Sequence, residues 1–129
     1  MQTKVWQVVD VGVGILKSSP PQLFIIASGV VNYTEWSHPT LIPYYYFIPP
    51  QDGIYDFDFV AEAPSEIVIP VVTPVVTTFI WENLPDGVMG VSVHGSTGEP
   101  KIKMLAEYSF NDIQQLVWHR PGFESMENG

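Results

Sequence analysis

The sequence predicts an all-β protein, more specifically an antiparallel β-sandwich that is Ig-like in the broad sense, with seven to eight strands and at most one short C-terminal helix. Three observations lead to this prediction. Short runs rich in Val, Ile, Tyr, Phe and Thr recur along the chain, and these residue types are enriched in strands. Prolines, glycines and Asp-Gly pairs interrupt the runs at short intervals, which is typical of turns. Helical spacing of apolar residues is confined to the C-terminal part. A small barrel is the alternative architecture.

The first two expected strands lie near the N-terminus. Residues 4–16 alternate with a period of two, which places the following side chains on one face: Val5, Val9, Val11, Val13 and Ile15. The second strand, Gln22–Val31, is almost continuously apolar, which is typical of a strand covered on both faces or at the centre of a sheet. Residues 32–43 are expected to form a loop.

The middle of the chain predicts a hairpin. Residues 44–48 are expected to form its first strand and Ile54–Glu62 its second, because aromatic and β-branched residues dominate both. The intervening residues 49–53 contain two prolines and an Asp-Gly pair, which favour a turn.

The remaining runs predict further strands at residues 66–72, 75–82, 88–94 and 101–105. Pro70 and Pro74 cannot donate ladder hydrogen bonds, so the first of these runs is expected at a sheet edge or in a bulge. The last run can also be interpreted as continuing to Phe110.

The C-terminus predicts the only helical segment. Asn111 is a suitable N-cap, and Ile113, Leu116 and Val117 follow at helical spacing, for one or two turns at most. Residues 1–120 are expected to form a single domain, followed by a solvated tail at residues 121–129.

Charge and composition restrict the possible partners. Five basic against 14 acidic residues give a net charge of −9 with neutral histidines, so we expect no nucleic-acid partner. The chain has no cysteine, which excludes disulfides and thiolate metal sites. No apolar run is long enough to predict a membrane span. The first residues lack a signal-peptide pattern, so we expect a cytoplasmic protein or a secreted one whose signal has been removed.

One candidate site follows from the alternation in Ile54–Glu62. The strand is expected to face the core with Tyr55, Phe57 and Phe59. Asp56 and Asp58 then share the opposite face, about 6.6–7 Å apart along the strand. This separation suits a carboxylate pair that acts on water, or, with His94, a metal site. The simpler interpretation is a solvated polar face, because none of the three histidines stands in a local metal-ligand motif.

A second candidate site rests on the aromatic residues, which number four Trp, six Tyr and seven Phe. If Tyr45 points outward near Trp36, the two rings could stack on a sugar or a peptide. The competing interpretation is that these rings fill the core.

The sequence therefore favours a non-enzymatic β-sandwich that acts as a recognition or structural module on a protein or glycan surface, and no cofactor is expected. Two alternatives stay open. One is a metal-dependent or carboxylate-based hydrolase that uses Asp56, Asp58 and His94, and the other is a carbohydrate-binding module built on Trp36 and Tyr45. We also expect a homo-oligomer, because lysines, which usually guard sheet edges, are scarce in the chain, and the long, mostly apolar strand at residues 4–16 is a candidate for an unprotected edge.

Overall fold

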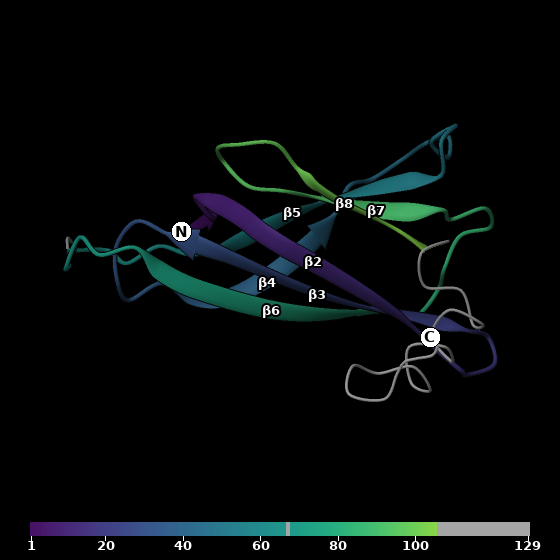
Figure 1. Ribbon diagram of the computed structural model, residues 1–129, viewed down its shortest axis with the longest axis horizontal. Helices are drawn as coiled ribbons and strands as arrows, with labels where there is room; N and C mark the ends of the chain where they lie inside the picture. Colours follow the sequence, from purple (N-terminus) through teal and green to yellow (C-terminus); the bar gives the residue numbers. More distant parts are fainter. Residues whose placement is uncertain (67, 106–129) are drawn as a thin grey trace, which may run out of the picture.

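The computed structural model describes residues 1–66 and 68–105, which form eight strands in two sheets and no helix (Figure 1). The strands are β1 (Gln2–Lys4), β2 (Gln7–Leu16), β3 (Gln22–Val31), β4 (Ser37–Pro43), β5 (Ile54–Glu62), β6 (Thr73–Trp81), β7 (Gly90–His94) and β8 (Lys101–Met104). The all-β class predicted from the sequence is thus confirmed. The expected helix at residues 111–117, the extension to Phe110 and the tail at 121–129 lie outside the described residues. None of the described residues belongs to a helix long and apolar enough to span a membrane.

The smaller sheet has the strand order β2-β3-β6, with both pairs antiparallel (Figure 1). β3 is its central strand, as its apolar sequence predicts, and β2 is an edge strand. Of the two alternatives that its apolar sequence leaves open, the central position in a sheet is found, and only one face of β3 is covered. Leu23 and Ile25 are fully buried on one face, whereas Ile26 on the other face is exposed.

The larger sheet is built around β5. β4 pairs with one side of β5, β1 and β7 pair with the other side, and β8 lies outside β7. β5 and β7 run parallel, so the sheet is mixed, and the prediction of a purely antiparallel arrangement is wrong. The physical reason is the path of the chain between them. It crosses to the smaller sheet as β6 before it returns, and a return from the other layer can enter in either direction.

The core lies between the two sheets. Phe57 and Phe59 are fully buried and Tyr55 is nearly so, which confirms the predicted core face of β5. The ring of Phe57 lies edge-on to Phe79 and Trp81 of β6, with centroids 5.6 and 5.3 Å away. These contacts pack one sheet against the other.

Two irregularities interrupt the expected strand at residues 4–16. Val5 and Trp6 separate β1 from β2, and a β-bulge lies within β2, where the register against β3 shifts between Val8 and Asp10. The shift adds one residue and inverts the alternation. Val8 is consequently buried, and Val9, which the period of two places on the core face, is 53 % exposed.

Three further segments differ from the sequence-based expectation. Residues 32–43, expected as a loop, contain β4, an edge strand that tolerates Pro39 and Pro43. Residues 44–48, expected as a strand, lie outside the ladder, because pairing of β4 with β5 ends at Pro43. The described part of 66–72 contains no strand. The edge strand or bulge expected there is therefore not found in the described residues, and Pro70 within the run cannot donate a ladder hydrogen bond.

Candidate functional site

A polar network lies on the outer face of the larger sheet. Asp56 and Asp58 point outward from β5, opposite the buried aromatic side chains. The parallel register places His94 of β7 beside Asp58. His94 Nε2 lies 2.8 Å from Asp56 Oδ1, and all three side chains are only half-buried. The structure therefore brings together the three residues that the sequence analysis grouped.

Two tyrosines complete this network. The Tyr46 hydroxyl donates to Asp56 Oδ2 at 2.5 Å and accepts from the Asp56 backbone N–H at 3.0 Å. The Tyr44 hydroxyl donates to Asp58 Oδ1 at 3.0 Å, and its ring stacks on His94 with centroids 5.4 Å apart. A charged group joins from β1, since Lys4 Nζ lies 3.6 Å from Asp58 Oδ1. We call these six residues the Tyr–Asp–His network: Lys4, Tyr44, Tyr46, Asp56, Asp58 and His94.

Both tyrosines in the network have a raised pKa. Burial raises the pKa of Tyr46 to about 12, and its hydrogen bond to Asp56 contributes in the same direction. The pKa of Tyr44 is also raised, first by burial and then by the hydrogen bond to Asp58. A tyrosinate at either position would lie against a carboxylate, which disfavours ionisation. Both hydroxyl groups therefore remain hydrogen-bond donors throughout the neutral pH range.

The network has few oxygen atoms left for a metal ion. Asp56 Oδ1 contacts His94 and Asp56 Oδ2 accepts from Tyr46, while Asp58 Oδ1 is shared by Tyr44 and Lys4. Within residues 1–66 and 68–105, no group of three or more His, Cys, Asp or Glu side chains is arranged to hold a metal ion. The geometry instead fixes the positions of Tyr44 and Tyr46.

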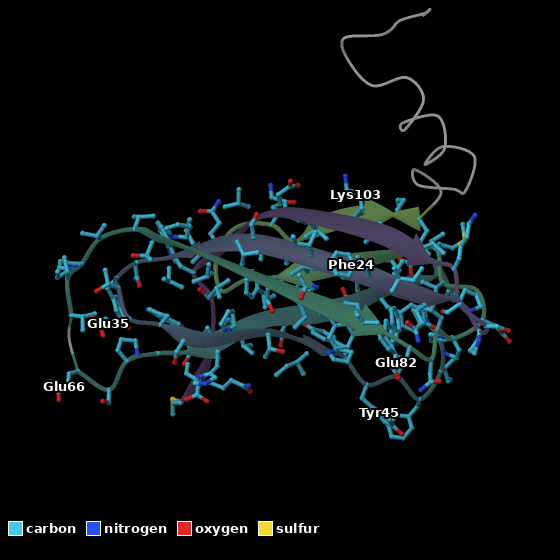
Figure 2. The ribbon with its side chains drawn as sticks, turned by 90° about the horizontal axis from the view of Figure 1, so that it is seen from below. Phe24, Glu35, Tyr45, Glu66, Glu82 and Lys103 are labelled. Carbon is cyan, nitrogen blue, oxygen red and sulfur yellow. The ribbon has the colours of Figure 1, made fainter. Side chains whose placement is uncertain are left out.

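The two tyrosines anchor residues 44–48, which we call the aromatic loop. Its other members point away from the protein. Tyr45 is 81 % exposed, Phe47 is 92 % exposed, and Ile48 is exposed as well. Figure 2 shows Tyr45 at the outer end of this loop, well clear of the sheets. The rings of Tyr45 and Phe47 meet edge to face, with centroids 5.2 Å apart and planes at 80°.

A groove of about 330 Å³ lies beside the aromatic loop and is lined by aromatic residues and prolines. Tyr55 of β5 and Trp81 of β6 contribute to its wall, and so does Tyr46. These three rings pack edge to face in succession, with centroid distances of 5.2 and 5.4 Å. The groove is thus continuous with the aromatic part of the core.

The structure does not bring Trp36 and Tyr45 together. Trp36 precedes Ser37, which pairs with Glu62 at one end of β5, whereas Tyr45 follows the last pair at Pro43 and Phe57. Trp36 packs against the core and the ring of Tyr33. Its buried Nε1 has no hydrogen-bond partner among the described residues.

Lys4, Tyr44 and Tyr46 were not predicted as site residues. A signal for the two tyrosines does exist in the sequence. Tyr44 and Tyr46 are spaced by two, as Asp56 and Asp58 are, and a turn separates the pairs. Matched spacing on either side of a turn places side chains opposite one another.

Comparisons with known proteins return no match: no family model fits the chain, and neither a curated protein nor a solved structure matches it.

Proposed function

We propose that the protein is a non-enzymatic recognition module, a β-sandwich that is Ig-like in the broad sense and has a mixed larger sheet. Its ligand is an extended peptide segment that contains proline, and it binds in the groove beside the aromatic loop. One observation carries the proposal: Tyr45 and Phe47 are almost fully exposed next to a groove lined by aromatic residues and prolines. Exposed aromatic rings beside such a groove are typical of ligand and peptide sites.

The polar groups of the groove favour a peptide over a sugar. A bound sugar needs hydrogen bonds to its hydroxyl groups as well as stacking on a ring. The hydroxyl groups of Tyr44 and Tyr46 already donate to Asp58 and Asp56. The rings of Tyr45 and Phe47 stand at 80° to each other and do not form one flat platform. A proline-containing segment needs mainly apolar ring contacts.

The charge around the groove points to a peptide with basic flanks. Asp86 directly follows Pro85 of the groove lining, and Asp52 lies in the turn after the aromatic loop. The chain as a whole carries a net charge of −9. An acidic surface attracts Lys- or Arg-containing ligands and repels acidic ones.

The Tyr–Asp–His network supports binding by holding the aromatic loop in place. Tyr44 and Tyr46 flank Tyr45 and are each fixed by a hydrogen bond to a carboxylate. A loop that is ordered before binding loses less conformational entropy when the ligand arrives.

The test is titration of the protein with a basic proline-rich decapeptide, followed by NMR, with cellohexaose as the sugar probe. We expect the peptide to bind with a dissociation constant on the order of 100 μM. Tyr45→Ala and Phe47→Ala should each weaken binding about tenfold. Ile69→Ala is the matched control, an exposed apolar side chain outside the groove lining. Binding of cellohexaose alone would support a carbohydrate-binding module instead, and binding of neither probe would contradict the proposal.

A hydrolase is the second candidate, favoured by the 2.8 Å contact between His94 and Asp56. Such a contact can orient an imidazole for proton transfer. Hydrolysis of p-nitrophenyl acetate and p-nitrophenyl glycosides by the protein and by Asp56→Asn separates the two functions. A recognition module should give equal background rates for both. A rate that Asp56→Asn abolishes in a folded protein would support the hydrolase.

A further inference from the structure

A second groove adjoins the groove beside the aromatic loop. It has a volume of about 470 Å³ and is formed by the β2–β3 turn, the segment between β6 and β7, and the residue after β8. We call it the proline groove, because Pro20, Pro21 and Pro85 contribute to its lining. Pro85 also lines the groove beside the aromatic loop, so the two grooves meet at this residue. A single extended peptide can therefore contact both.

The described part of the chain ends in the proline groove. Leu105 contributes to its lining, and the Leu105 backbone N–H donates to the Met89 carbonyl at 2.7 Å. Residues 106–129 continue the sequence from this point. An extended chain as long as residues 106–119 spans at most about 50 Å. The residues that follow them are thus within reach of every part of either groove.

The sequence beyond Leu105 contains a segment of the kind that the groove is proposed to bind. Residues 113–123 include Arg120 directly before Pro121 and have no Asp or Glu, although the net charge of the chain is −9. Arg120 is the single arginine of the chain, and Trp118 adds an apolar ring two residues before it. Such a segment combines the proline, the ring and the positive charge expected of the ligand.

Acidic residues surround the two grooves. Asp86 contributes to the lining of the proline groove. Glu82 follows Trp81 of the other groove lining, and Figure 2 shows it at the same end of the molecule as Tyr45. Both carboxylates are exposed. A basic segment of the chain is attracted to this end by the same charge that would attract a separate basic peptide.

We propose that residues 118–121 bind in the groove beside the aromatic loop of the same molecule and so compete with other peptides. This inference rests on the proposed function, because it uses the same site. Pro121 then contacts the groove, whereas the sequence alone predicts a solvated tail from this residue on. Linkage gives a ligand an effective concentration in the millimolar range, so a segment with a dissociation constant of about 100 μM is bound in most molecules.

Paramagnetic relaxation measured by NMR in the full chain tests the proposal directly. The chain has no cysteine, so Ser125→Cys provides a single attachment point for a nitroxide spin label. We expect the label to broaden the signals of residues 44–48 and Asp86. The signals of Thr73, at the opposite end of β6 from Trp81, should stay sharp. A mixture in which the spin label and the ¹⁵N label are on different molecules should show no broadening.

Arg120→Glu in the spin-labelled chain should abolish the broadening at residues 44–48. The same substitution without the label should strengthen binding of the basic proline-rich decapeptide about tenfold, because the competing segment is released. The matched control is Lys101→Glu, which makes the same change in net charge at an exposed position of β8. This control should change neither the broadening nor the affinity for the decapeptide.

The possible results separate this inference from the proposed function. If the decapeptide binds but the label broadens no signal of residues 44–48, the proposed function stands and the inference is wrong. Broadening that survives Arg120→Glu, or that appears between molecules, would also overturn it. Broadening that Arg120→Glu abolishes, without decapeptide binding to that variant, would support the bound segment and contradict the peptide-binding function.

Discussion

Phe57 is the side chain on which the contact between the two sheets depends most directly. It is fully buried and lies against Phe79 and Trp81 of the opposite sheet. Phe57→Ala should lower the free energy of unfolding by about 3–5 kcal/mol, the usual cost of deleting a buried ring. Urea denaturation measures this loss. Phe47→Ala, the same change at an exposed position, should change stability by less than about 0.5 kcal/mol. Equal effects of the two substitutions would contradict the packing described for β5.

The raised pKa of Tyr46 predicts that the folded protein becomes less stable at high pH. Its pKa is raised to about 12, mainly by burial and then by the hydrogen bond to Asp56, against the ordinary value of 10.0. The unfolded chain therefore loses the proton first. The contribution of protonated Tyr46 to the stability of the folded state is complete below pH 10 and is lost as the pH rises toward 12. In an ultraviolet titration of the tyrosines, Tyr46→Phe should remove a group that loses its proton near pH 12. Asp56→Asn should lower that pKa, and an unchanged titration in Asp56→Asn would contradict the hydrogen bond.

At the level of single residues, the sequence predicts the network better than the aromatic pair. Alternation within one strand is local, so the outward direction of Asp56 and Asp58 is predictable. The direction of Tyr45 is not predictable in this way, because residues 44–48 lie outside the strands. Its distance from Trp36 is not predictable either, because it depends on where β4 pairs with β5. The contact of His94 with Asp56 depends likewise on the parallel register of β7.

At the level of elements, the bulge in β2 gives a sharp test. Val8 is buried and Val9 is exposed, the reverse of a regular alternation that places Val9 on the core face. Val→Thr changes shape little but adds a hydroxyl group. Val8→Thr should cost about 1–3 kcal/mol, because the hydroxyl is buried without an assured partner. Val9→Thr should be nearly neutral on the surface. Thermal unfolding of the two variants compares them directly, and the opposite ranking would place the bulge elsewhere.

The elements that sequence patterns miss are those shaped by proline and side-chain contacts. Pro39 and Pro43 suggest a loop, yet β4 is an edge strand, where a missing N–H is tolerated. Residues 44–48 have strong strand propensity, but Tyr44 and Tyr46 bond to the outer face of β5 instead. Propensity describes how well a residue fits a strand, and tertiary contacts decide whether it joins one.

At the level of the whole molecule, strand content is predictable from composition and strand direction is not. The recurring β-branched and aromatic runs predict seven to eight strands, and the described residues form eight, although the runs at 44–48 and 66–72 are not among them. The parallel pairing of β5 with β7 joins residues far apart in sequence, with β6 of the other sheet between them. The residue pattern of a strand is the same whether it pairs in parallel or antiparallel, so no local pattern predicts this crossover.

The two sheets share one core, which predicts that they unfold together. β3 and β5 are each paired on both sides, and both carry fully buried side chains such as Ile25 and Phe59. Their backbone amides should therefore exchange with solvent only through global unfolding, with the same free energy in both strands. Hydrogen exchange followed by NMR measures these values.

A substitution in one sheet tests this coupling. Phe57→Ala lies in β5, and its ring partners lie in β6, which pairs with β3. If the core is shared, the substitution should reduce protection in β3 by as much as in β5. A loss confined to β5 and its neighbours would show that the larger sheet opens alone. The smaller sheet would then have to remain folded without the rings of β5 against it, although its core face of Val8, Leu23 and Ile25 is buried by that sheet. Exposing this apolar face to water costs free energy in proportion to the area uncovered. We therefore expect the two sheets to unfold together in one cooperative transition.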